Sequence, residues 1–184
     1  MELAVPDPSL ADEAIALRPL QPGDAAAVAA SCRDAEIVRW TTQIPLDYTE
    51  ENASNWILFA RDSWATGNAD FAVVERASDT FVGAVGLVVR EPWLGEIGYW
   101  TAEPFRLRGY TTRALKLVSD WGHALGLTRL QLTILVGNTA SERVAEKAGY
   151  LIEGTLRSYA NQRGNLRDAT LWAKLSTDQP VLPR

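Results

Sequence analysis

Seven short stretches of the chain are rich in apolar residues that alternate with other residues or run together, the pattern of β-strands. Turn sequences containing Gly, Pro, Asn, Asp or Ser separate several of them. The predicted strands are residues 14–18, 71–75, 81–89, 96–100, 130–136, 151–159 and 166–175. Residues 161–165, Asn-Gln-Arg-Gly-Asn, form the predicted hairpin turn between the last two.

Between the first and second strands the pattern favours helices. Asp24 is the expected N-cap of an alanine-rich helix that continues through Asp34–Trp40. Thr49 begins a second helix with two acidic residues in its first turn, and this helix ends near Gly67.

Two later helices flank the fifth strand. The helical spacing of apolar residues from Ala114 to Trp121 predicts the first, which ends at Gly126. Residues 139–142, Thr-Ala-Ser-Glu, have the form of a capping box and begin the second, which ends at Gly149.

The order of these elements predicts an α/β (α+β) fold: one mixed sheet with helices on both faces and a central βαβ crossover. The length of 184 residues suits a single domain over residues 1–184, with a core of about 14–176. The first dozen residues and the tail from Thr177 to Arg184 are expected to be loosely ordered.

Composition narrows the class of function. The net charge of −5 opposes binding to nucleic acid or to an anionic membrane. Cys32 is the only cysteine and His123 the only histidine, so the sequence excludes an internal disulfide and a catalytic zinc site, and no metal is expected. The chain has no long apolar run and does not begin like a secretory signal, which favours a cytoplasmic location.

The most informative segment is Phe105–Leu115, between a predicted strand and a predicted helix. Free backbone amides at a helix N-terminus and the helix dipole attract anions, and Gly109 permits a close approach to the backbone. Arg106, Arg108 and Arg113 add positive charge. The segment lacks the Gly-Lys-Ser/Thr of a P-loop and the further glycines of a dinucleotide fingerprint. It is interpreted as a pyrophosphate-binding loop, or else as a plain turn with solvated arginines.

Arg106-x-x-Gly109-x-Thr111 resembles the Gln/Arg-x-x-Gly-x-Gly/Ala loop of the GNAT superfamily of N-acetyltransferases. Four further segments resemble the RimJ/RimL-like branch, and together the resemblance spans about residues 17–175. These segments are 96–100, 138–150, 153–157 and 167–168. The resemblance implies a single mostly antiparallel, seven-stranded GNAT-like sheet with a central βαβ unit that binds acetyl-CoA. Thr111 departs from the pattern, because it stands where the family usually has Gly or Ala.

The resemblance also implies which residues bind acetyl-CoA, the cosubstrate. Amides of the loop would hold its pyrophosphate, and Ile97–Thr101 would pair with the pantetheine arm. The predicted binding residues are Tyr99, Trp100, Thr101, Arg106, Leu107, Arg108, Gly109, Tyr110, Thr111, Thr112, Asn138, Ser141 and Arg143. Arg143 and Lys147 share one helical face, and a solvated surface pair is the alternative interpretation.

In the branch that the chain resembles, the residue matching Asn138 binds the pantetheine arm and the residue matching Ser141 protonates the departing thiolate. Helix capping is the alternative role for both. Many relatives use a tyrosine as this acid, but its position here is Ala145. Ser141 is therefore the predicted catalytic acid.

The attacking amine must be neutral. An α-amino group has a pKa of about 7.7–8.0 and a lysine amine one of about 10.4, so an N-terminal acceptor needs only a weak base. Glu96, on a central strand, is the predicted catalytic base, with a structural role bonding a hydroxyl or an arginine as the alternative. Asp168 is expected to pair with Arg157 or Arg167.

The predicted function is acetyl transfer from acetyl-CoA to a primary amine in a ternary complex, with a protein N-terminus as the first choice of acceptor. A small amine, such as an aminoglycoside or a polyamine, is an alternative, and so is a weakly catalytic acyl-CoA-binding module. Trp40 and Tyr159 are expected to line the acceptor site. The net charge suits a basic acceptor peptide, and the sequence leaves a homodimer open.

Overall fold

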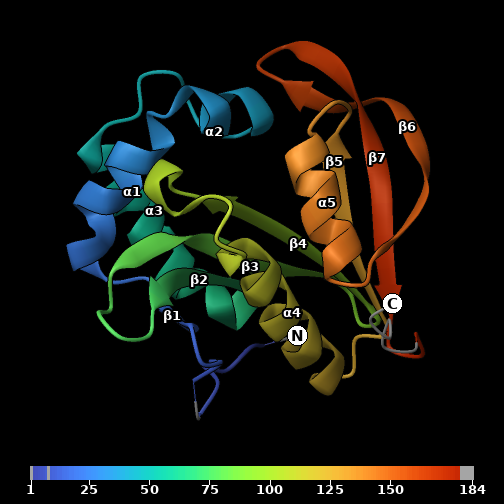
Figure 1. The fold of residues 1–184 in the computed structure, drawn as a ribbon, viewed down its shortest axis with the longest axis horizontal. Helices are drawn as coiled ribbons and strands as arrows, with labels where there is room; N and C mark the ends of the chain where they lie inside the picture. Colours follow the sequence, from blue (N-terminus) through green and yellow to red (C-terminus); the bar gives the residue numbers. More distant parts are fainter. Residues whose placement is uncertain (1, 8, 179–184) are drawn as a thin grey trace.

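A single sheet organises the chain in the computed structural model, which describes residues 2–7 and 9–178 (Figure 1). Its strand order is β1-β2-β3-β4-β5-β7-β6. The strands are β1 (Ile15–Pro19), β2 (Asn68–Glu75), β3 (Phe81–Glu91), β4 (Leu94–Thr101), β5 (Arg129–Leu135), β6 (Leu151–Gln162) and β7 (Asn165–Leu175). Only β4 and β5 pair in parallel; the other neighbours are antiparallel. The predicted seven strands and mostly antiparallel mixed sheet are confirmed.

Helices cover both faces of the sheet, as predicted. They are α1 (Ala25–Cys32), α2 (Ala35–Trp40), α3 (Glu50–Asp62), α4 (Tyr110–Ala124) and α5 (Thr139–Lys147), with 3₁₀ turns at Pro22–Asp24, Ser63–Thr66 and Glu103–Phe105. The apolar stripe of α4, with Leu115 and Val118, packs on one face together with α5. Val28 of α1 and Ile57 of α3 pack on the opposite face.

Three predictions at helix starts were wrong. Asp24 does not cap α1 with its side chain; its carboxylate accepts the Gln21 amide and pairs with Arg18. The segment 34–40 does not continue α1, because the Asp34 side chain accepts the amides of Glu36 and Ile37 and so begins α2 as a separate helix. The capping box predicted at residues 139–142 does not form, although α5 begins at Thr139 as predicted; Asn138 caps it, which is the alternative role given above, and its side chain accepts the Ser141 amide at 3.2 Å.

The N-terminal segment is more ordered than predicted. Leu3 is buried in the core, and its amide donates to the carbonyl of Trp64 at 3.0 Å. The carbonyl of Leu10 accepts the amide of Leu17 at 2.8 Å. The burial of Leu3 therefore fixes part of the N-terminal segment that was predicted to be loosely ordered. Of the predicted loose tail, Thr177–Arg184, the structure describes Thr177 and Asp178, and the amide of Asp178 donates to the carbonyl of Leu175 at 3.0 Å. Residues 179–184 lie outside the described residues.

Strands β4 and β5 pair only at one end. The pairs are Leu94 with Arg129, Gly95 with Leu130, and Glu96 with Gln131. A Cβ on Gly95 would lie 2.8 Å from a methyl carbon of Leu130, so a glycine there lets the strands meet closely. Beyond Glu96, β4 stays paired with β3 as far as Thr101, while its other edge has no strand partner in the described chain. Figure 1 shows the two strands diverging from their paired end.

The β6–β7 hairpin reaches across to the segment after α2. Its turn residues Arg163 and Gly164 both have positive φ, 52° and 86°, which is typical of a two-residue type I′ turn. The buried Gln162 donates to the carbonyls of Arg39 and Thr41 at 2.7 and 3.2 Å. The hairpin and α2 therefore form one fixed wall. Among the described residues, no helix has the length and apolar character needed to cross a membrane.

Candidate active site

The loop before α4 presents a row of unpaired backbone amides. Within the described chain, the amides of residues 107–112 have no hydrogen-bond acceptor, and intrahelical bonding begins at Arg113, whose amide donates to the Gly109 carbonyl. Gly109 has φ of 80°, and a Cβ there would meet nothing within 4 Å. Leu107 adopts φ of 63° although it is not a glycine. This strained geometry directs successive amides toward an anion.

The arginines of the loop are all paired with carboxylates, a feature that the sequence did not indicate. Arg106 contacts Asp34 at 2.9 Å, Arg108 lies 3.7 Å from Glu75, and Arg113 pairs with Asp12 at 2.8 Å. Their positive charge is therefore largely compensated. The amides and the α4 dipole remain as the anion-binding elements of the loop.

Other predicted binding residues surround the open edge of β4. The hydroxyls of Thr101 and Thr111 lie 2.6 Å apart, so the Thr111 side chain turns back to β4 while its amide has no partner among the described residues. The Trp100 ring packs instead on the α1 and α3 face, and the Tyr110 hydroxyl donates to Glu75 at 2.8 Å. Trp100 and Tyr110 thus offer only their backbones to this edge. Thr112 lies in the first turn of α4.

A pair of hydroxyls links β4 to α5 on the α4 side of the sheet. The Tyr99 and Ser141 hydroxyls lie 2.9 Å apart, and Asn138 fixes the Ser141 amide. Burial raises the pKa of Tyr99 to about 12, so its hydroxyl stays protonated at neutral pH. The sequence placed Tyr99 here only through its backbone. Only the fold revealed that its hydroxyl contacts Ser141.

Glu96 lies on the opposite face of the sheet, at the last pair before β4 and β5 diverge. One carboxylate oxygen accepts Arg90 Nε at 2.8 Å and the other accepts the Thr133 hydroxyl at 3.4 Å. Both contacts belong to the structural alternative that the sequence left open. The same contacts hold the carboxylate at the opening, where an incoming amine would pass.

The remaining predicted residues are distributed unevenly around this opening. The Trp40 ring comes within 3.7 Å of the Cβ position of Gly137, beside Asn138. Tyr159 is 54% exposed, in a bulge of β6. Arg143 lines a shallow cavity with Glu142, Glu146, Thr139, Ile152 and Trp172, on the side of α5 that faces β6 and β7. The structure does not bring Arg143 against the loop before α4.

Asp168 has a different partner from the one predicted. Its carboxylate accepts the amide of Ser158 at 2.7 Å and makes no ion pair with Arg157 or Arg167 in the described chain. Ser158 has φ of 51° within the β6 bulge. The bulge leaves this amide without a strand partner, and Asp168 satisfies it.

This combination of an open β4 edge and a following amide-lined loop matches a known family. A family model described as an acetyltransferase (GNAT) domain matches residues 15–151. The chain belongs to the GNAT acetyltransferase family. The predicted resemblance to its RimJ/RimL-like branch is confirmed by the relatives described next.

The chain is similar to relatives over most of its length. Uncharacterized N-acetyltransferase YoaA of Bacillus subtilis (strain 168) is 25% identical over 169 residues, which cover 90% of this chain and 96% of that protein. Ribosomal-protein-serine acetyltransferase of Escherichia coli (strain K12) is 28% identical over 104 residues, 55% of this chain and 58% of that protein. The structure of Mycobacterium smegmatis RimJ in complex with CoA-disulfide has a TM-score of 0.78 at 26% identity, covering 90% of this chain and 84% of that one.

The protein is accordingly an acetyl-CoA-dependent N-acetyltransferase. Acetyl-CoA supplies an activated acetyl group as a thioester. The residues present fit this molecule, because the amides of residues 107–112 suit a pyrophosphate and the unpaired edge of β4 suits the amides of a pantetheine arm.

We expect Gly109→Ala to raise the Kd of coenzyme A by about tenfold, because an L-residue costs about 1–2 kcal/mol in the left-handed conformation that the loop needs. Calorimetric titration measures this Kd. Gly126→Ala is the matched control: Gly126 also has positive φ (95°) and an open Cβ position, but it lies at the far end of α4. Equal coenzyme A affinity in the two variants would contradict the role of the loop.

Proposed function

We propose that this enzyme acetylates the α-amino group of a protein or peptide N-terminus, with the amine attacking the thioester directly while both substrates are bound. The observation that carries the proposal is that hydroxyl and carboxylate side chains lie on opposite faces of the sheet where β4 and β5 diverge. A hydroxyl pair, Tyr99 and Ser141, lies on one face, and a carboxylate, Glu96, lies on the other. The name of the Escherichia coli relative, Ribosomal-protein-serine acetyltransferase, supports a protein acceptor.

In this proposal, different residues bind the separate parts of acetyl-CoA and the acceptor. The amides of the loop from Leu107 to Thr112, with Arg106 and Arg108 beside them, hold the pyrophosphate, and the open β4 edge from Tyr99 to Thr101 and Asn138 hold the arm. Arg143, on α5, is proposed to contact the ribose phosphate. Trp40 and Tyr159 line the acceptor side. The acceptor enters from the α3 face, past Glu96.

Each face of the sheet is proposed to serve one of the two proton transfers. Ser141 donates its proton to the departing thiolate, and the Tyr99 hydroxyl, 2.9 Å away, is placed to restore it. Glu96 draws the protonated amine to the opening and assists its deprotonation. An α-amino group suits this arrangement, because it loses its proton about 2–3 pKa units more readily than a lysine side chain. We place the enzyme in the cytoplasm, where acetyl-CoA and nascent N-termini occur together.

We expect a peptide with a free N-terminus and one internal lysine to carry acetyl on the α-amine. The rate should rise between about pH 6.5 and 8.5 with the titration of that amine. Mass spectrometry of the product locates the acetyl group. Acetyl found mainly on the lysine, or only on small amines such as polyamines, would overturn the proposed acceptor. Thiol release without any acetylated acceptor would favour the acyl-CoA-binding alternative.

We expect Ser141→Ala to lower kcat by about tenfold or more, with little change in the Kd of acetyl-CoA, because the thiolate then leaves without its acid. Tyr99→Phe should lower kcat in the same direction and by less. Thr139→Ala is the control, since Thr139 lies in the same helical turn but does not cap it. Unchanged kcat in Ser141→Ala, measured by thiol release, would leave Ser141 a structural role alone.

A further inference from the structure

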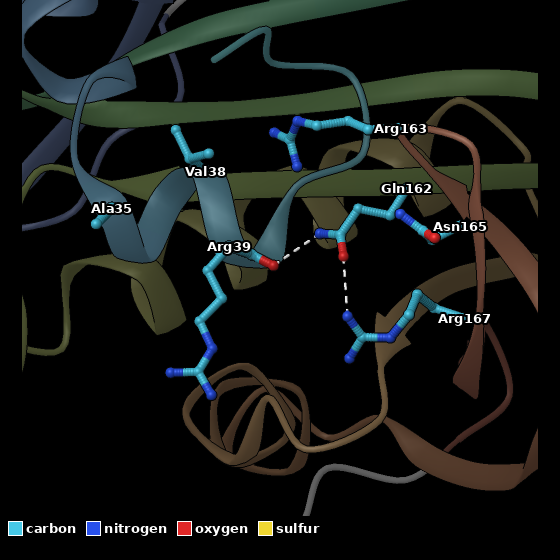
Figure 2. Close-up of a pocket in the computed structure, with 7 residues that line it drawn as sticks. All are labelled: Ala35, Val38, Arg39, Gln162, Arg163, Asn165 and Arg167. Atoms are coloured by element: carbon cyan, nitrogen blue, oxygen red, sulfur yellow. Dashed lines mark hydrogen bonds between the residues drawn. The ribbon is translucent and has the colours of Figure 1, made fainter.

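A basic cavity lies where the β6–β7 hairpin meets α2. Its volume is about 380 Å³. Its lining residues are Ala35, Val38, Arg39, Gln162, Arg163, Asn165 and Arg167, three of them arginines and none a carboxylate. Figure 2 shows Gln162, Arg163 and Arg167 reaching from the hairpin toward α2.

The guanidinium groups are held in place largely by neutral partners. Arg167 donates to Gln162 Oε1 at 2.9 Å, and Arg163 donates to the carbonyls of Thr41 and Ile44. Only Arg39 contacts a carboxylate, Glu36, at 3.4 Å. The cavity therefore carries positive charge that the described residues leave uncompensated, unlike the loop before α4.

The cavity lies beside the reaction centre. On one wall, Trp40 follows Arg39 and contacts the Cβ position of Gly137 at 3.7 Å. On the other wall, Asp168 follows Arg167, and its carbonyl accepts the Val136 amide at 3.0 Å. Both walls thus flank the turn at residues 136–137, which leads directly into Asn138 and Ser141.

We propose that this cavity binds a carboxylate of the acceptor, so that the enzyme selects N-terminal segments with an acidic residue close behind the reacting amine. The inference rests on the proposed α-amine acetylation. It replaces the expectation of a basic acceptor, since the net charge of −5 acts over long range whereas bidentate guanidinium contacts decide binding at short range.

The test compares two peptides with the same N-terminal residue, one with Asp and one with Asn at the second and third positions. Wild-type kcat/KM should be about tenfold higher for the acidic peptide. Arg167→Gln should remove this preference and keep kcat/KM for the Asn peptide. Arg61→Gln is the matched control, since Arg61 is an exposed arginine of α3 outside the cavity and should keep the preference.

Equal kcat/KM for both peptides with the wild type would overturn the acidic subsite and leave α-amine acetylation standing. A preference that survives Arg167→Gln would also overturn it. Acetylation of neither peptide, with small amines still acetylated, would overturn the proposed acceptor and this subsite together.

A second and separate observation concerns Asp70 on β2. Asp70, Gly86 and Gly98 lie directly opposite one another on β2, β3 and β4 and so share one face of the sheet. One Asp70 carboxylate oxygen lies 2.2 Å from where a Cβ of Gly86 would stand. The carboxylate therefore extends across β3 toward β4, into space that only a glycine leaves free.

This carboxylate has no hydrogen bond or ion pair among the described residues, whereas its charged neighbours are already engaged. On the same face, Arg18 pairs with Asp24 and Arg90 pairs with Glu96. The α3 residues that pack on this face are apolar: Ala53, Ile57 and Ala60. Burial raises the pKa of Asp70 to about 6, which suits a group that accepts a proton near neutral pH.

The next position along this row is Gly98, at the open edge of β4. Gly98 lies on β4 beyond its last pair with β5, and a Cβ there would meet nothing within 4 Å. Neighbouring strands lie about 4.8 Å apart, so a carboxylate above Gly86 is about one strand spacing from the open face of Gly98. One water spans such a distance.

The geometry assigns Asp70 as the group that accepts, through one water above Gly98, the proton that the nitrogen loses during attack, while Glu96 holds the acceptor and assists its deprotonation before attack. As the nitrogen forms its bond to the acetyl carbon and the carbon–sulfur bond breaks, the nitrogen's proton passes to the water and the water's proton to Asp70. The thiolate takes its proton from Ser141 on the other face. This assignment rests on the acetylation of amines by the enzyme.

Asp70→Asn tests the assignment. We expect kcat to fall by about tenfold to a hundredfold at pH 7, the Kd of acetyl-CoA to stay unchanged, and the rise of kcat/KM near pH 6 to disappear, leaving only the titration of the amine. The melting temperature should rise, because an uncompensated, half-buried carboxylate is removed. Gly86→Ala should also lower kcat, since its Cβ displaces the carboxylate.

Wild-type kcat and an intact rise near pH 6 in Asp70→Asn would overturn the assignment. So would a lower melting temperature with loss of acetyl-CoA binding, because a structural carboxylate behaves in that way. A wild type that releases thiol but acetylates no amine would overturn the proposed function instead, and the proton-accepting role with it.

Discussion

The candidate site depends on the loss of pairing between β4 and β5 after Glu96. Backbone amides and carbonyls away from water need partners, so an unpaired strand edge inside a sheet is costly unless another chain of polar groups fills it. Gly95 lets β4 and β5 approach closely at one end, because it has no side chain there. Beyond that end the two strands diverge, and β4 is left with an edge to which the amides of a pantetheine arm can pair. The loop before α4 continues this edge with further unpaired amides.

Two groups of arginines near the site differ in the charge of their partners. The arginines of the loop before α4 are neutralised by Asp34, Glu75 and Asp12, whereas those near the hairpin have mostly neutral partners. Asp34 also caps α2, so the ion pair with Arg106 ties the loop to the helix that walls the basic cavity. The loop proposed to bind coenzyme A and the cavity proposed to bind the acceptor are therefore joined by this ion pair.

In the proposed mechanism, the sheet separates the two proton transfers. Side chains alternate between its faces, so Tyr99 points toward α5 and Ser141 while Glu96 and Gly98 face α3. Asp70 reaches the α3 face from two strands away, and only because Gly86 stands between. The proposed acid and base groups are thus kept apart by the same backbone that is proposed to bind the arm.

The sequence by itself determined the strands, the long helices, the hairpin turn and the loop at Gly109, because periodicity and turn chemistry are local. It also made Ser141 a candidate through the family resemblance and Glu96 a candidate through its place on a central strand. It left the cap at Asn138 as an alternative, and it missed the buried Leu3, the partners of the loop arginines, the contact of the Tyr99 hydroxyl with Ser141 and the unpaired carboxylate of Asp70. These depend on contacts between residues far apart in the sequence, such as Arg106 with Asp34, and only the register of the sheet and the packing of the helices decided them.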